Sequence, residues 1–142
     1  EKSLGCIHKG GHHPVEEVYD YAKQMEYGKG LVIMDTPGND PSSVAGMAAG
    51  GCQLVLFSTG RGTPTGNPIA PVIKLTANPI TYGKMKDNID VDGSILLEHP
   101  EKMDEVADAL VAEIIDFANG KATKSESLGF YELAIARVCN YV

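Results

Sequence analysis

The sequence predicts an α/β fold with three layers, in which a small, mainly parallel sheet is flanked by helices in a Rossmann-like arrangement. Three short runs, at 31–35, 53–58 and 72–76, are apolar almost throughout. Such runs are typical of strands that are covered on both faces. A helix-forming segment connects the first two runs by short links, which indicates a right-handed crossover within one parallel sheet. With 142 residues, the chain is long enough to form one domain with its own core.

The first part of the chain predicts a surface segment and then a helix. Residues 1–13 are rich in glycine and histidine, which is typical of an exposed entry segment. Pro14 suits the first turn of a helix, and the apolar residues after it recur at helical spacing. We therefore expect a helix that ends before Gly28 and Gly30, with one face made of Val15, Val18, Tyr19, Ala22 and Met25.

Capping residues mark three further short helices or turns. Asp40 followed by Pro41 predicts a helix that continues through Ala49 and ends at the two glycines at 50–51. Asn67 predicts a single turn, and Asn78 predicts a helix to about residue 86. We expect a glycine turn with a short strand in the segment 87–97.

The segment 100–119 predicts the longest helix of the chain. Its apolar residues form a continuous stripe, and acidic residues lie in its first turn, where the helix dipole favours them. Gly120 suits the position after the helix end. Residues 121–129 are polar and predict a loop, and the amphipathic tail 130–142 is too short to place. The stripe consists of Met103, Val106, Ala107, Leu110, Val111, Ile114, Ile115 and Ala118.

Composition excludes two classes of partner. The formal net charge is −7 and there is no tryptophan, which argues against binding to nucleic acid. No run approaches the roughly 20 apolar residues of a membrane span. The odd and widely spaced Cys6, Cys52 and Cys139 are typical of reduced thiols in a cytoplasmic protein. Since the chain begins at Glu1 without methionine, we expect residues 1–142 to be one domain taken from a longer protein.

The segment 59–67 is the strongest candidate for a binding loop. Its three glycines allow backbone N–H groups to approach a ligand, and successive N–H groups can form an anion nest. Arg61 offers a bidentate fork for a carboxylate or phosphate. The neutral side chains and glycines suit the hydroxyls of a polyhydroxy acid, and the alternative is a loop that merely turns the chain. The candidate substrate-binding residues are Thr59, Gly60, Gly62, Thr63, Thr65, Gly66 and Asn67.

Several residues outside this loop could have either a functional or a structural role. Asp35 ends a strand and could be a general base, a metal ligand or a turn cap. Lys74 lies within an apolar strand, so its ammonium must reach a partner or a cleft. We interpret His8, His12 and His13 as surface residues rather than metal ligands. The loop 59–67 matches neither the Walker A pattern nor the dinucleotide fingerprint, which argues against a nucleotide-binding unit.

Two stretches, MDTPGNDPSSVAGMAAGG and LVLFSTGRGTPTGNPIAPVIKLTANP, resemble the C-terminal part of the altronate dehydratase and galactarate dehydratase family. The resemblance extends from about residue 4 to residue 129, and its core is at 34–79. Family members carry further domains upstream. The larger subunit of sulfolactate sulfo-lyase is a similar alternative. The tail FYELAIARVCNYV departs from the family's ending.

The resemblance implies a hydro-lyase that converts a sugar acid of the altronate or galactarate type to a 2-keto-3-deoxy acid. It also implies a divalent metal, Fe2+, whose ligands are unknown, as well as upstream domains and a homo-oligomer. From residue type we assign catalytic roles to Asp35 as base or ligand, and to Arg61 and Lys74 as cations beside the substrate carboxylate. The isolated unit is expected to be inactive. The rival hypothesis is a non-catalytic module for anion binding or dimerisation.

Overall fold

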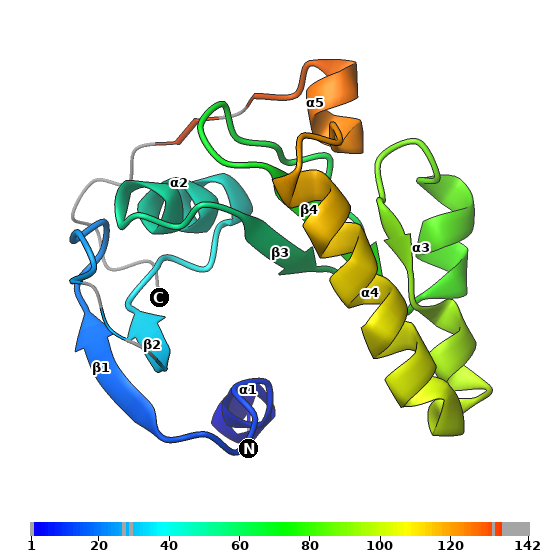
Figure 1. Cartoon of the computed structure of the whole chain (residues 1–142), viewed down its shortest axis with the longest axis horizontal. Helices are drawn as coiled ribbons and strands as arrows, with labels where there is room; N and C mark the ends of the chain where they lie inside the picture. The colour runs from blue at the N-terminus through cyan, green and yellow to red at the C-terminus, as the bar shows by residue number, and fades with distance from the viewer. Residues whose placement is uncertain (1, 27, 29, 132, 135–142) are drawn as a thin grey trace.

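The computed structural model describes residues 2–26, 28, 30–131, 133 and 134. These residues form the mixed α/β fold that the sequence predicts, with small parallel sheets and flanking helices (Figure 1). In chain order the elements are α1 (Lys2–His8), β1 (Val15–Tyr19), β2 (Leu31–Met34), α2 (Asp40–Ala49), β3 (Val55–Ser58), β4 (Val72–Thr76), α3 (Pro79–Lys84), β5 (Val91–Asp92), the 3-10 helices η1 (Ser94–Leu97) and η2 (Pro100–Lys102), α4 (Met103–Ala118) and α5 (Lys124–Leu128). No described helix has the length and apolar character needed to cross a membrane.

The strands form two parallel sheets rather than one. β1 pairs with β2, and β3, β4 and β5 pair in that order. The expected crossover from the strand at 31–35 to that at 53–58 therefore joins two sheets and not two neighbours in one sheet. The Rossmann-like arrangement is not confirmed, because it requires the strands to share a single sheet.

Helix α2 lies between the two sheets and contacts both (Figure 1). On one side, Val44 packs with Val55 and Val72 in the apolar core. On the other side, Gly46 lies against the ring of Tyr21, where an added Cβ would come within 2.3 Å of a ring carbon. The Tyr21 hydroxyl also donates to a carbonyl of α2, at 2.8 Å. A small residue at position 46 is thus required for the close approach of the β1–β2 segment.

Asparagine side chains start two helices. Asn39, rather than the expected Asp40, is the N-cap of α2, and its side chain accepts from the Ser42 N–H. Asp40 occupies the first helical turn, where a carboxylate is favoured by the helix dipole. Asn78 caps α3 as predicted, since its Oδ1 accepts from two backbone N–H groups.

The predicted helix after Pro14 is wrong, because residues 15–19 form strand β1. Valine and tyrosine favour extended backbone, and pairing with β2 satisfies the backbone groups of this segment. The ladder continues one step further, where the Asp35 N–H donates to the Tyr19 carbonyl at 2.9 Å. The glycine-rich beginning of the chain, interpreted as an exposed entry segment, contains helix α1.

The prediction of a long helix near the C-terminus is confirmed, but the segment after it was misjudged. A 3-10 turn at Pro100–Lys102 precedes α4. Residues 121–129 were expected to form a loop, yet they contain α5. Thr123 and Glu126 form a capping box, and Gly129 ends the helix at φ 72°. Most of the tail 130–142 lies outside the described residues.

Candidate functional site

The loop between β3 and β4 begins at the carboxyl end of β3, where open α/β sheets usually bind ligands. Gly60 and Arg61 are exposed, and Thr59 is half-buried. The Thr59 hydroxyl accepts from the Gly62 N–H at 3.0 Å, which closes a tight turn. Gly62 has φ +88° and lies against the Met85 sulfur, so both its conformation and its surroundings require glycine.

Helix α3 holds this turn in place. The Gly60 carbonyl accepts from the Thr81 hydroxyl at 2.7 Å and from the Asn78 amide at 3.1 Å. These two bonds join the end of β3 to the first turn of the helix that follows β4. The backbone of residues 59–62 is therefore fixed by its neighbours, although its side chains remain accessible.

A pocket of about 690 Å³ opens at the carboxyl ends of β3 and β4. Hydroxyl and amide groups of Ser58, Thr59 and Asn78 lie on its wall, together with Lys9 from the segment after α1. Apolar side chains, among them Ile80 and Leu97, form the remainder. The lining includes one cation and no carboxylate, which suits a hydroxylated anion of small size.

The second half of the loop is buried in the interior. Thr63, Thr65 and Asn67 are each at most 5% exposed. The two threonine hydroxyls are 2.8 Å apart, and the Asn67 Oδ1 accepts from two backbone N–H groups, as the predicted single turn requires. A Cβ on Gly66 would lie 2.0 Å from the Phe130 carbonyl oxygen. The Nδ2 of Asn67 is buried with no hydrogen-bond partner among the described residues.

Lys74 and Asp90 form a buried ion pair on the neighbouring strands. The Lys74 Nζ lies 3.6 Å from the Asp90 Oδ2, and the two side chains are 0% and 2% exposed. The Asp90 carboxylate also accepts from the backbone N–H groups of Lys74 and Lys124, each at 2.8 Å. This carboxylate therefore ties β4, the start of β5 and the start of α5 together. Asp90 was not singled out from the sequence, because a carboxylate in an irregular segment gives no pattern that marks it.

Asp35 lies at the end of β2, in the other sheet from the loop. Its side chain is exposed, and no described contact joins it to Arg61 or to the pocket at β3 and β4. The described structure thus brings Thr59, Gly60 and Arg61 together but does not bring Asp35 to them. The role of Asp35 as base or ligand stays a prediction.

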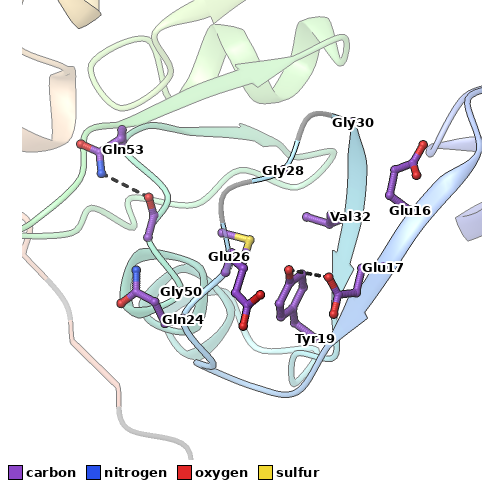
Figure 2. A pocket seen from close by; sticks show the side chains of 12 residues that line it. Glu16, Glu17, Tyr19, Gln24, Glu26, Gly28, Gly30, Val32, Gly50 and Gln53 are labelled. Atoms are coloured by element: carbon purple, nitrogen blue, oxygen red, sulfur yellow. Dashed lines mark hydrogen bonds between the residues drawn. The ribbon is translucent and has the colours of Figure 1, made fainter.

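A second pocket, of about 630 Å³, lies beside the β1–β2 sheet and has a different character (Figure 2). Glu16, Glu17 and Glu26 line it, and the Tyr19 hydroxyl donates to the Glu17 carboxylate at 2.7 Å. This hydrogen bond and the burial of the ring raise the pKa of Tyr19. Three carboxylates repel an anionic ligand. The pocket at β3 and β4 is therefore the better candidate for binding an acid.

Comparison with known proteins identifies the family of the chain. The family model described as D-galactarate/Altronate dehydratase, C-terminal, matches residues 1–140. The chain belongs to this dehydratase C-terminal family.

Three relatives show how much of a longer protein the match covers. Altronate dehydratase of Escherichia coli (strain K12) is 40% identical over 135 residues, which are 95% of this chain and 27% of the relative. The subunit beta of (2R)-sulfolactate sulfo-lyase from Chromohalobacter salexigens is 40% identical over 139 residues, 97% of this chain and 36% of the relative. Galactarate dehydratase (L-threo-forming) of E. coli is 33% identical over 137 residues, 95% of this chain and 26% of the relative.

The divalent metal that membership of the dehydratase family suggests finds no ligand set here. Among the described residues, no three His, Cys, Asp or Glu side chains come together in a way that could hold a metal ion. His8, His12 and His13 lie in and after α1, where all three are exposed. The described residues therefore provide hydrogen-bonding groups and cations at the pocket, but no cluster of three metal-ligating side chains.

Sequence reasoning did not assign Lys9, Ser58, Thr76 or Asn78 to the site, although all four line the pocket. Ser58 ends β3, and Lys9 follows α1. Ser58 could have been predicted as a pocket residue, because it is the last residue of a predicted strand beside the candidate loop. Lys9 was not, because only the tertiary structure brings the beginning of the chain to this edge of the sheet.

Proposed function

We propose that this chain is part of a hydro-lyase that dehydrates a sugar acid of the altronate or galactarate type to a 2-keto-3-deoxy acid. The reaction removes the proton alpha to the carboxylate and expels the beta-hydroxyl group. The observation that carries the proposal is the pocket of about 690 Å³ at β3 and β4, whose lining includes hydroxyl, amide and ammonium groups among apolar side chains. The dehydratases among the relatives support the same reaction class.

In this proposal the turn 59–62 binds the substrate carboxylate. Gly60 lines the pocket, and the exposed Arg61 follows it in the turn without being part of the lining. In this proposal the Arg61 guanidinium and the Lys9 ammonium supply positive charge beside the carboxylate oxygens. Such charge stabilises the enolate that forms when the alpha proton leaves. Ser58, Thr59 and Asn78 supply hydrogen bonds to the hydroxyl groups of the sugar acid.

The remaining candidates take supporting roles. Thr63, Thr65, Gly66 and Asn67 are buried, so we propose that they anchor the loop rather than contact the acid directly. We keep Asp35 as a candidate base. The Fe2+ that the family resemblance implies would be held by residues outside those described, and no step is assigned to it here.

The test is the longer enzyme that carries this unit, supplied with Fe2+ and offered a panel of aldonic and aldaric acids. We expect one acid to yield a 2-keto acid, and Arg61→Ala to lower kcat/KM by about 10- to 100-fold through the loss of a charged hydrogen bond. Lys84→Ala is the matched control, because Lys84 is an exposed cation on α3 that belongs neither to the turn 59–62 nor to the pocket lining. Turnover by Arg61→Ala equal to that of the unmodified enzyme would place the substrate elsewhere.

A second candidate is elimination of a sulfo group, since the sulfo-lyase relative is as similar to this chain as the altronate dehydratase of E. coli. The shared chemistry is loss of a proton alpha to a carboxylate and of a leaving group on the beta carbon. Including sulfolactate in the panel separates the two, because release of sulfite and release of water leave different products. A binding or dimerisation module without catalytic residues would leave Arg61→Ala without effect on turnover.

A further inference from the structure

We propose that one side of α4 docks onto the part of a longer dehydratase that this chain does not contain, and that this partner surface is apolar with a rim of lysine or arginine side chains. The α4 ridge is defined here as Met103, Ala107, Val111 and Ile115. These residues recur every four positions and so form one row along the helix. Met103, Val111 and Ile115 are 55%, 54% and 54% exposed.

The α4 ridge is additional to the surface by which the helix packs on its own domain. Phe117 is buried, and Val106, Leu110 and Ile114 are half-buried, so these residues face the domain. The long helix crosses one side of the molecule in Figure 1. A helix that only covered its own domain would need one apolar stripe and polar residues elsewhere. Its exposed apolar ridge is therefore available to a partner.

The charge beside the ridge indicates what kind of partner fits. Asp104, Asp108 and Asp116 each follow a ridge residue in the sequence and so form an acidic row next to it, and all three are exposed. Neither Asp104 nor Asp108 forms an ion pair with a described residue. Cations on a partner would complement this row and set its orientation.

A second copy of the chain fits this surface less well. Helix α4 contains no lysine or arginine, and the chain carries a formal charge of −7. Two α4 ridges in contact would bring together acidic rows without a cation from either helix. The chain spans 27% of the altronate dehydratase of E. coli, so the rest of such an enzyme provides ample surface for the complementary partner.

The test compares the same variants in two contexts: the 142-residue chain alone, and the longer enzyme that contains it. Val111→Lys and Ile115→Lys place a charge on the α4 ridge. Ala109→Lys is the matched control, because position 109 is exposed on α4 but belongs neither to the ridge nor to the acidic row beside it. In the longer enzyme we expect the ridge variants to lower the melting temperature by about 5 °C or more, whereas the control does not. In the isolated chain all three variants should melt as the unmodified chain does, because exposed substitutions cost little.

Equal losses in both contexts would show that the ridge is needed by the domain itself, and no loss in either would show that it has no partner. Sedimentation of the isolated chain covers the remaining case, since a dimer that Val111→Lys dissociates would make a second copy the partner. Asp108→Lys tests the rim. Because it opposes a basic surface, it should lower the melting temperature of the longer enzyme only, and a higher melting temperature would overturn the proposed basic rim.

Discussion

Replacement of Lys74 by methionine tests whether the buried ion pair holds the domain together. The substitution keeps an unbranched side chain of similar length but replaces the ammonium group and the Cδ methylene by a neutral thioether. The Asp90 carboxylate would then remain buried, at 2% exposure, with two backbone N–H groups as its donors. A buried charge that loses its counter-ion is strongly destabilising. We therefore expect Lys74→Met to lower the free energy of unfolding of the isolated chain.

The geometry sets the size of the effect. At 3.6 Å and an effective dielectric constant of about 20, two unit charges attract by roughly 4–5 kcal/mol. Removing one partner of a buried pair costs about 3–5 kcal/mol in measured cases. The two N–H groups that remain on Asp90 offset part of this loss, so we expect about 3 kcal/mol. That is a large fraction of the roughly 5–15 kcal/mol that stabilises an ordinary domain.

Urea unfolding followed by circular dichroism measures the change, provided that the m-value stays constant. The double variant Lys74→Met/Asp90→Asn is the internal check, because it removes both charges and should lose less than the sum of the single variants. A loss below about 1 kcal/mol for Lys74→Met, or additive losses, would refute the reasoning. If the longer enzyme lost activity at unchanged stability, Lys74 would have the catalytic role predicted from the sequence.

Three further predictions concern the surroundings of the loop. Gly66→Ala should lower the free energy of unfolding by about 2–3 kcal/mol, because the new methyl group would meet the Phe130 carbonyl; Gly60→Ala, which has open space, is the control in the same urea titration. Thr123→Ala removes the capping box with Glu126 and should cost about 1 kcal/mol, with a matching loss of helix signal on heating. Burial raises the pKa of the Cys52 thiol, so less thiolate is present at pH 8. Iodoacetamide should therefore modify Cys52 more slowly in the folded chain than in urea, as measured by mass spectrometry of its peptide, and equal rates would contradict this.

The short apolar runs could be predicted to be strands from the sequence, but the pairing of these strands could not be predicted. Residues 55–58 and 72–76 form strands as expected, because valine- and isoleucine-rich runs of this length are favoured when both faces are covered. Residues 15–19 were misjudged, since their apolar spacing is compatible with a helix and only the pairing with β2 makes them a strand. The division into two sheets depends on α2 lying between them, which is a tertiary arrangement without a local sequence pattern.

Local capping patterns were the most reliable guide, and one of them was overlooked. Asn78 followed by proline predicts a helix start because its side chain can satisfy free N–H groups, and the structure contains both hydrogen bonds. The same reasoning applies to the spacing of Thr123 and Glu126, which matches a capping box. That pattern would have placed α5 in the segment predicted as a loop.

The candidate loop was predicted as one binding unit, whereas the structure divides it into an accessible and a buried half. Both halves consist of glycine and small polar residues, so the sequence alone could not separate them. The separation arises because Gly66 packs against Phe130 and Ser125, which belong to a distant part of the chain. The buried half is thereby joined to the start of α5, and α5 is joined through Lys124 to the Asp90 carboxylate.

This connection gives the buried half of the loop a function without contact to a ligand. Hydrogen bonds from α3 hold the turn at Thr59 and Gly60 directly, and the anchoring of residues 63–67 to α5 adds a second support in the chain that follows. A substitution at Gly66 should then change the geometry of the turn at 59–62 although it lies outside the pocket. Sites built on supported backbone lose substrate affinity or rate when the support moves by as little as about 1 Å. The buried polar residues and the exposed turn are therefore two parts of one arrangement, and both are needed for the proposed binding of an acid at the strand ends.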